Sequence, residues 1–451
     1  MTTNLFDFLE LEARLQQQNY FSAAHLTELF DQKIAKSRAV GKDGTRAAKF
    51  REIVASEVAL IERKVQTQSY QFTSYREKLL VRGFDREPRQ ISIPTIRDRL
   101  TLRALCKLLH EHIPDSVGPP PHSLIANVVD LVRSGLSDHS FVRIDVKNFF
   151  PSILHSRIQK DLRRNNIEEP FIQLILKAIQ NSTGNGGVAN VRGIPQGLSI
   201  SGALSAIYMQ RVDKRHAAQN ERFFRYVDDI LIVCPTNFAH EKLKIVSRSL
   251  SNIGLKTHDL GVAGKTEIKD ISEGIDFLGY HIATDKVSIR DASYQRMFKN
   301  VLRVITDYKY RRNQQKTAFR LNLKISGCLV DKQKRGWMMF FAQTEDFSQL
   351  AFLDQFVIKQ LRRVGFPEGE LPNIKTFIKS VHEIRFNLNE TGYIPNFDTY
   401  TIQQKVDVIC RLSGKLPEEL DHLSDDEIDL EFSRLISREI SDLEKDVGNP
   451  S

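Results

Sequence analysis

Residues 222–233, RFFRYVDDILIV, place two adjacent carboxylates between an aromatic run and a run of branched aliphatic side chains. Runs of this composition and length predict two short buried strands joined by a tight turn, with Asp228 and Asp229 at the turn. Burying an unpaired carboxylate is unfavourable by several kcal/mol, so something cationic should meet these two acids. The hairpin therefore predicts a buried site that holds positive charge.

The segments around this hairpin predict the sheet that contains it. Residues 1–70 show helical periodicity, and 76–94 predict two strands around a polar turn. The segment 141–153 predicts a short strand that ends at Asp145, followed by a turn and helices. After the hairpin come an amphipathic helix and, at 275–282, another strand. This order of strand, helix, hairpin, helix and strand matches the ferredoxin-like split βαβ plan.

Asp145 and the pair Asp228 and Asp229 each lie at the end of an apolar strand. In a split βαβ sheet the first strand and the hairpin are neighbours, so the three carboxylates are expected to converge. Hard oxygen ligands in that number suit Mg²⁺, which keeps waters and accepts substrate phosphates. Two such ions, roughly 3.5–4 Å apart, bind the attacking and leaving oxygens of a phosphoryl transfer. For any one of these acids alone, a turn former or a helix cap is the simpler interpretation.

The charge of the chain is unevenly distributed. A net charge of +9 over 451 residues favours a polyanionic partner, although solubility or a membrane surface would explain the same charge. Residues 290–336 contain thirteen Lys or Arg against three Asp, and 416–446 contain twelve acids against three bases. The first segment predicts a basic helical surface, and the second is expected to contact protein rather than nucleic acid.

Four scattered cysteines without metal-ligand spacing are typical of core residues in a reducing compartment. The N-terminal residues lack the pattern of a signal peptide, and no run approaches the length of a membrane span. A cytosolic protein is therefore expected. The aromatic segments 336–343 and 392–400 are compatible with protein core or with an RNA-stacking surface, and we favour core.

Several motifs together resemble those of reverse transcriptases. RYVDDILIV resembles the YxDD motif, RIDVKNFFPSI the first palm motif, and GIPQGLSISGALSAIY the motif that packs against the incoming base pair. The finger strand RQISIPTIRDRLTLRAL and the later segments KTEI and IDFLGYHI also match. The resemblance covers residues 75–330 in order.

This resemblance implies roles for the acids and for one lysine. Asp145, Asp228 and Asp229 become the metal ligands, with the carbonyl of Val146 as a fourth contact. Lys265 is similar to the lysine that protonates the leaving pyrophosphate, although a solvated surface lysine is an equal alternative.

It also implies contacts to the incoming nucleotide. Arg89, which enters the second finger strand, is similar to the arginine that grips the triphosphate, with Lys78 or Arg82 as a helper. Gln196 and Gly197 fall where the family's helix approaches the nascent base pair.

Phe150, five residues after Asp145, is expected beneath the sugar of the incoming nucleotide. An aromatic ring there would collide with a ribose 2′ hydroxyl and leave deoxyribose untouched. The alternative is that Phe149 and Phe150 both belong to the core. Because adjacent residues point apart, at least one of them is expected there.

Two departures from the family pattern refine the placement. Asn148 stands where many bacterial relatives have a third aspartate, which removes a charge without removing a metal ligand. The segment GLSISGALSAIY lacks the proline usual in retron and intron-encoded enzymes. Together with a C-terminal extension unlike that of an intron maturase, this favours the bacterial defence-associated and abortive-infection reverse transcriptases.

The expected fold class is α+β, a right-hand polymerase with a ferredoxin-like palm, a helical fingers extension, a helical thumb and a helical C-terminal module. The expected boundaries are 1–140 for N-terminal helices and fingers, 141–288 for the palm with a finger insertion at about 155–190, 289–365 for the thumb and 366–451 for the extension. Within the basic thumb, phosphate contacts are expected from Arg311, Arg312, Lys316 and Arg320, with a solvated helical face as the alternative.

The resemblance implies an RNA-directed DNA polymerase that adds dNTPs to a primer 3′ hydroxyl with two Mg²⁺ ions, on a noncoding RNA template in bacterial antiviral defence. Expected partners are the RNA, the DNA product and dNTPs, with a second copy or another protein at the acidic C-terminal tail. The alternatives are a template-independent or protein-primed DNA polymerase of the abortive-infection type, an RNA-synthesising polymerase, and a non-catalytic RNA-binding scaffold.

Overall fold

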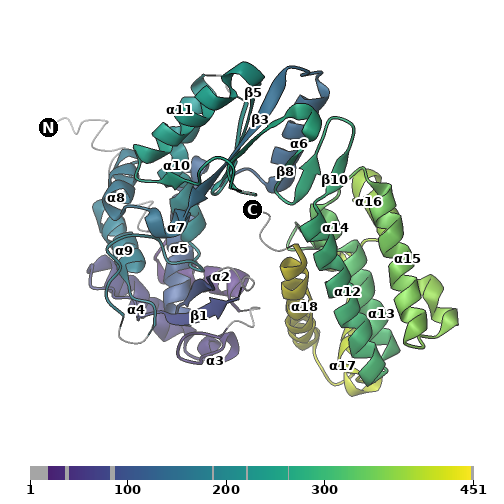
Figure 1. The fold of residues 1–451 in the computed structure, drawn as a ribbon. Coiled ribbons are helices and arrows are strands. Elements are labelled where there is room, and N and C mark those ends of the chain that lie inside the picture. Colours follow the sequence, from purple (N-terminus) through teal and green to yellow (C-terminus); the bar gives the residue numbers. More distant parts are fainter. Residues whose placement is uncertain are drawn as a thin grey trace. The chain divides into compact units, whose positions relative to one another are not determined.

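The chain divides into two units, each of which makes most of its contacts within itself (Figure 1). The first unit consists of Met1–Pro119 with Val142–Ile268, and the second of Pro120–Phe141 with Lys269–Ser451. The computed structural model describes residues 19–35, 40–81, 87–184, 187–219, 222–262 and 264–447. The fold is a mixture of α and β. The four modules expected from the sequence are finer than this division and stay a prediction.

Helices dominate the N-terminal part of the first unit, as the periodicity predicted. They are α2 (Ala23–Lys33), α3 (Ala47–Arg51), α4 (Val54–Gln66) and α5 (Ile96–His112). Between α4 and α5 lie β1 (Arg76–Leu80) and β2 (Arg89–Ile93), which pair in antiparallel register. The hydroxyl of Thr95 accepts a hydrogen bond from the N–H of Asp98, so α5 begins with an N-cap directly after Pro94.

A five-stranded sheet in the first unit carries the predicted motifs. Its strands are β3 (His139–Lys147), β4 (Arg222–Tyr226), β5 (Asp229–Pro235), β6 (Lys256–Thr257) and β7 (Glu267–Asp270). Their order is β4-β5-β3-β6, and β7 also pairs with β3. The hairpin is confirmed, since β4 and β5 are antiparallel and Tyr226 pairs with Asp229. The neighbourhood of β3 and the hairpin is confirmed as well.

Helices α10 (Ser201–Ala218) and α11 (Ala239–Ser251) pack on one face of this sheet (Figure 1). Successive side chains of a strand point to opposite faces. The side chains on one face of the sheet join a hydrophobic cluster with the helices. The strand residues of this cluster are Val142, Ile144, Val146, Ile230, Ile232 and Cys234. Arg143 and Asp145 alternate with these residues, so they point to the opposite face. After β3 come α7 (Phe149–Ser152), α8 (His155–Arg164) and α9 (Glu169–Gln180).

The prediction for 275–282 is wrong in two respects, the number of strands and the sheet to which they belong. The segment forms two strands, β8 (Ile275–Phe277) and β9 (Tyr280–Ile282), which pair with β10 (Val287–Ile289) in a separate three-stranded sheet. The turn residues Leu278 and Gly279 both have positive φ, at 46° and 84°. A two-residue hairpin turn of this kind normally shows Asn-Gly or Asp-Gly, so a leucine hides the signal. The strand that follows α11 in the main sheet is instead β6.

The second unit is largely helical. Its helices are α6 (Pro121–Arg133), α12 (Asp291–Arg311), α13 (Gln314–Ser326), α14 (Trp337–Phe340), α15 (Phe347–Arg363), α16 (Phe377–Phe386), α17 (Ile402–Ser413) and α18 (Asp425–Val447), and β11 (Cys328–Val330) pairs with β12 (Gln333–Arg335). Trp337, Phe341 and Phe397 are buried, which confirms that the two aromatic segments belong to the core. Among the described residues, no helix has the length and apolar character needed to cross a bilayer.

The acidic C-terminal segment packs inside the second unit, and the second copy or other protein expected at this segment stays a prediction. The ammonium of Lys324 in α13 donates to Asp446 of α18 at 2.7 Å and lies 3.1 Å from Asp442. Arg320, one turn earlier, donates to Glu439 at 2.9 Å. The apolar side of α18 joins a hydrophobic cluster with α17. Helix α18 is therefore an integral part of this helical core.

Candidate active site

Asp145 and Asp228 are 83 positions apart in sequence and lie close together at one end of the five-stranded sheet. Asp145 is near the end of β3, and Asp228 lies in the turn between β4 and β5. Burial first, and then the neighbouring charges of Asp145 and Asp229, raise the pKa of Asp228 to about 6, while a backbone hydrogen bond and the charge of Arg89 oppose the shift. Two carboxylates that repel each other in a partly buried place form a binding site for a cation.

The turn that carries Asp228 is strained. Val227 has φ 57°, in a position where a two-residue hairpin turn normally has glycine. A positive φ at a β-branched residue costs about 1–3 kcal/mol and persists only where neighbours impose it. Arg225 holds the turn from β4, since it forms an ion pair with Asp213 of α10 and donates to the carbonyl of Val227 at 2.9 Å. The strain therefore marks a turn that the sheet and α10 hold in place.

Asp145 is contacted from two sides. The ammonium of Lys265 donates to its carboxylate at 2.5 Å, and the N–H of His258 donates to its backbone carbonyl at 3.0 Å. Lys265 lies in the turn before β7, which pairs with β3. The structure thus places the predicted lysine directly against the predicted metal ligand.

Asp229 is placed differently from the other two acids. It begins β5 with its side chain buried, and its two carboxylate oxygens accept from Arg143 at 3.1 and 3.2 Å. Glu267 lies 3.7 Å from the same guanidinium. An arginine on the neighbouring strand thus engages Asp229, and the expected binding of one metal site by all three carboxylates stays a prediction.

The residues present fit a divalent cation held by two carboxylates. Among the described residues, no group of three His, Cys, Asp or Glu side chains is arranged to bind a metal ion. Asp145 and Asp228 supply hard oxygen donors with excess negative charge, which suits Mg²⁺ with waters or substrate phosphates as its other ligands. The carbonyl of Val146 is a further donor, because the Asp145 carbonyl bonds toward β6 and successive strand carbonyls point to opposite edges. It therefore points to the β5 side of the strand.

The predicted nucleotide contacts Arg89 and Gln196 meet in the structure. The guanidinium of Arg89 at the start of β2 donates to the side-chain oxygen of Gln196. The carbonyl of Gln196 accepts from the N–H of Ser92 at 2.7 Å, so the turn at 196–197 is bound to β2. Gly197 follows with φ 99°, where an added Cβ would lie 2.7 Å from the side chain of Ile91. Close approach of two backbones therefore requires the glycine.

Lys78 and Arg82 are less well placed by the structure. Lys78 lies on β1, paired with Ile91 of β2, and its side chain is exposed. Arg82 lies outside the described residues. A triphosphate role for either stays a prediction.

Phe149 and Phe150 separate as expected. Phe149 is buried in the core at 3% exposure, whereas Phe150 is half-buried at the edge of the same cluster. The backbone turns between β3 and α7 at Asn148, which is left-handed with φ 46° and ψ 49°. Asparagine and aspartate both tolerate this conformation better than most residues, so the turn accommodates either residue at 148.

The four predicted phosphate contacts in the second unit stay a prediction, and the structure shows a contact within the protein for each side chain. Lys316 donates to the carbonyl of Leu412 at 2.7 Å, and Arg320 forms its ion pairs with the acids of α18. Arg312 donates to the carbonyl of Val364 at 2.8 Å. These three side chains hold helices together. Arg311 is exposed and pairs with an acid of its own helix, Asp307, at 2.9 Å.

Sequence reasoning missed Arg143, although a signal was present. A lone arginine two residues before Asp145 interrupts the apolar run FVRIDV and must point to the same face as that acid. Its neighbour Glu267 offered no such signal, because β7 is short and polar. A cation on that face was the expected partner of the buried acids.

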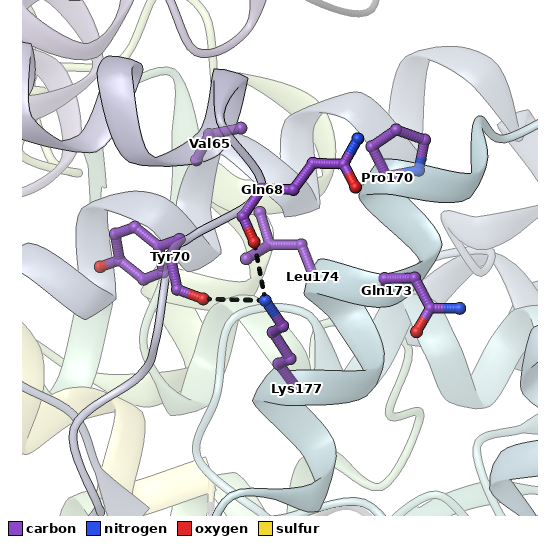
Figure 2. A pocket seen from close by; sticks show the side chains of 7 residues that line it. All are labelled: Val65, Gln68, Tyr70, Pro170, Gln173, Leu174 and Lys177. Carbon is purple, nitrogen blue, oxygen red and sulfur yellow. Dashed lines mark hydrogen bonds between the residues drawn. The ribbon is translucent and has the colours of Figure 1, made fainter.

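A separate pocket lies between the end of α4 and α9 (Figure 2). Its volume is about 240 Å³, and its lining residues are Val65, Gln68, Tyr70, Pro170, Gln173, Leu174 and Lys177. The ammonium of Lys177 donates to the carbonyls of Gln68 and Tyr70 at 3.0 and 3.2 Å (Figure 2). Gln68 has φ 54°, so Lys177 stabilises a strained turn. This pocket shares no residue with the candidate active site.

The comparison with protein families agrees with the motifs. A family model described as reverse transcriptase (RNA-dependent DNA polymerase) matches residues 82–282. No curated protein matches the sequence. A solved structure of telomerase from Candida albicans with a TWJ fragment of telomeric RNA is similar at 14% identity and TM-score 0.42, over 88% of this chain and 67% of that one. An apo telomerase from Candida tropicalis, truncated from its C-terminal domain, is similar at 14% identity and TM-score 0.33, over 56% and 63%.

Proposed function

We propose that this chain, an RNA-dependent DNA polymerase with a reverse transcriptase domain at residues 82–282, copies RNA by metal-assisted nucleotidyl transfer at Asp145 and Asp228. The observation that carries the proposal is the meeting of these two acids at one end of the sheet, with the pKa of Asp228 raised to about 6 by burial and by its neighbouring carboxylates. A structural pair of acids would be expected to have a cationic partner for each member.

Different side chains would contact the triphosphate, the nascent base pair and the leaving pyrophosphate. Arg89 and Gln196, already in contact, would hold the triphosphate and the nascent base pair. Lys265, at 2.5 Å from Asp145, would deliver a proton to the leaving pyrophosphate. The chemistry that two Mg²⁺ ions would supply at Asp145 and Asp228 is activation of the primer 3′ hydroxyl and neutralisation of charge on the leaving group.

Cations on α12 are better candidates for phosphate contacts than those on α13. Lys299, Arg303 and Lys309 have exposed side chains, and in the described part of the chain none of them forms an ion pair. Arg311, by contrast, is exposed but already paired within the helix. Exposed, unpaired cations along one helix suit the backbone of a template–primer duplex.

The finer proposal is that the protein copies a noncoding RNA template in bacterial antiviral defence, within the cytoplasm. It rests on two departures from the family pattern: GLSISGALSAIY lacks the proline usual in retron and intron-encoded enzymes, and the C-terminal extension is unlike that of an intron maturase. A template-independent or protein-primed DNA polymerase is the second candidate for the same site, because both share the metal-binding acids. Sequencing the DNA made by the purified protein, with and without its co-purified RNA, separates these two functions.

The test of the catalytic proposal is primer extension on an RNA template with Mg²⁺. Asp228→Asn keeps the shape of the turn and removes its charge, so DNA synthesis should fall by about a thousandfold or more. Asp407→Asn, at an exposed position of α17, is the matched control and should extend primers like the parent. Synthesis by Asp228→Asn near the parent rate would remove the metal assignment.

A further inference from the structure

Arg143 lies in the middle of β3 and forms an ion pair with Asp229, the second aspartate of the YVDD segment. Its Nε and Nη2 donate to the two oxygens of Asp229, at 3.1 and 3.2 Å. The arginine side chain is 6% exposed and the aspartate 4%. A planar guanidinium that bonds both oxygens of a carboxylate fixes its orientation as well as its charge.

This pairing anchors the hairpin next to the turn. Asp229 is the first residue of β5 and pairs with Tyr226, the last residue of β4. The two residues between them are the strained Val227 and the candidate ligand Asp228. A fixed Asp229 therefore fixes where the strand begins and where Asp228 projects.

The other two acids have weaker attachments. Asp145 accepts from one lysine, whose side chain is 34% exposed, and an ammonium on a flexible stem is easily displaced. Asp228 lies in the turn between β4 and β5. Metal binding at Asp229 would break a bidentate buried pair and leave Arg143 desolvated without its partner, which is strongly unfavourable.

We propose that Arg143 is a positioning residue that keeps Asp229 in the sheet as the anchor of the hairpin, so that Asp145 and Asp228 hold the divalent metal without Asp229. The inference rests on the proposed function, since it assigns the ligands of the same site. It gives two adjacent acids of the sequence motif different roles, because Asp228 binds the metal and Asp229 anchors the hairpin.

The test uses Mn²⁺ as the probe, titrated into the full chain and followed by its electron paramagnetic resonance signal. Asp228→Asn removes a ligand and should weaken Mn²⁺ binding by about tenfold or more. Asp229→Asn keeps an oxygen for Arg143 and should weaken Mn²⁺ binding only by the several-fold that the loss of one nearby negative charge explains, clearly less than Asp228→Asn. Equal losses in the two variants would overturn the inference.

Arg143→Met supplies a signature that a purely structural role would not produce. It removes a positive charge from the site and leaves Asp229 unpaired, so Mn²⁺ should bind several-fold more tightly. Arg143→Met combined with Asp229→Leu removes both charges and should return the affinity to the parent value. Unchanged or weaker Mn²⁺ binding in folded Arg143→Met overturns the proposal.

Two further measurements keep the outcome clear. If Arg143→Met does not fold, Arg143→Lys takes its place, because it keeps the positive charge and loses the bidentate contact to Asp229. The thermal midpoint of Arg143→Lys should fall while its Mn²⁺ affinity stays at the parent value. A loss of Mn²⁺ affinity in parallel with the thermal midpoint counts against the proposal. If the parent binds no Mn²⁺ and extends no primer, the proposed function itself fails. Parent binding with equal losses in the two aspartate variants refutes only the role of Arg143.

Discussion

Two phenylalanines after Asp145 have different surroundings, and the difference assigns them different tasks. Phe149 is enclosed in the core, whereas Phe150 is half-buried, with the two rings 5.3 Å apart at 70°. A half-buried ring such as that of Phe150 can contact a substrate, whereas a buried ring such as that of Phe149 contributes to stability. The assignment of sugar selection to Phe150 stays a prediction.

Phe150→Ala should relax the discrimination against ribonucleotides. Removing the ring opens space for a 2′ hydroxyl, so rNTP incorporation relative to dNTP should rise by at least about tenfold. The measurement is single-nucleotide incorporation of each substrate on one RNA template.

Phe149→Ala is the matched control. It removes a buried ring, so the free energy of unfolding should fall by about 3–5 kcal/mol, without a gain in rNTP use by the folded fraction. A parent enzyme that already prefers rNTPs would contradict the assignment to DNA synthesis.

At the scale of elements, the turn at 196–197 and strand β2 form one structure. Gly197→Ala would place a Cβ 2.7 Å from the Ile91 side chain and 3.0 Å from the Ser92 carbonyl, at a φ of 99° that alanine rarely adopts. We expect a loss of about 2 kcal/mol or more in stability and a higher KM for dNTPs, because Gln196 loses its position.

Gly202→Ala in α10 is the control for the Gly197 variant. An added Cβ there meets no atom within 4 Å. Alanine favours a helix over glycine by roughly 0.5–1 kcal/mol, so stability should be unchanged or slightly higher. A selective loss of DNA synthesis in Gly202→Ala with full stability would support close approach of this helix to the nascent base pair. Equal stability of the two variants would refute the packing argument for Gly197.

Asp354 of α15 links two helices of the second unit. It accepts from the N–H groups of Phe377 and Ile378 at the start of α16, at 2.6 and 3.3 Å. Burial raises the pKa of Asp354 to about 6, despite the opposing hydrogen bonds from these two backbone groups. The folded protein therefore holds a proton there more tightly than the unfolded chain, whose pKa is near 3.8.

The sign of the pH effect follows from that difference. Stability from the bound proton is fully present below about pH 4 and is lost as the pH rises through about 6. The advantage of Asp354→Asn over the parent should grow by about 1–2 kcal/mol between pH 5 and 7.5, after allowance for solvent screening. The fluorescence of Trp337, the one tryptophan of the chain, reports unfolding of this unit. A difference independent of pH would contradict the shifted pKa.

For the molecule as a whole, the net charge of +9 overstates the charge open to a polyanion. Part of the basic segment 290–336 is neutralised by α18, as Arg320 and Lys324 show. The exposed cations of α12 are among those left for a duplex. The same helix bundle thus contains one basic face for packing and one for solvent.

Replacing Lys299, Arg303 and Lys309 with Gln should weaken template–primer binding for all sequences alike. The slope of log affinity against log salt should flatten by up to about 0.9 for each phosphate that the variant no longer neutralises. Fluorescence anisotropy of a labelled RNA–DNA duplex at several salt concentrations measures this slope.

The control for this change removes the same charge elsewhere. Lys33, Lys49 and Arg63 are exposed on the N-terminal helices of the first unit, and Gln at those positions lowers the net charge equally. An equal flattening in both triple variants would mean that net charge, and not the α12 surface, sets the affinity.

Local pattern was enough to predict the elements that carry the site. The alternation in β3, the paired apolar runs of β4 and β5 and the helical periods of α5 and α11 each depend on near neighbours in sequence. The split βαβ order then placed Asp145 beside the hairpin. The burial of Phe149 agrees with the expectation that at least one of the two phenylalanines belongs to the core.

Tertiary structure decided which charges pair. Arg143 meets Asp229 because β3 and β5 are neighbours, and Lys324 meets Asp446 because α18 returns to α13 from 122 residues away. No local pattern encodes such partners, because a charged side chain suits solvent, phosphate or another charge equally well until the fold desolvates it. Burial then makes an unpaired charge prohibitive, and the fold selects the partner that the sequence leaves open.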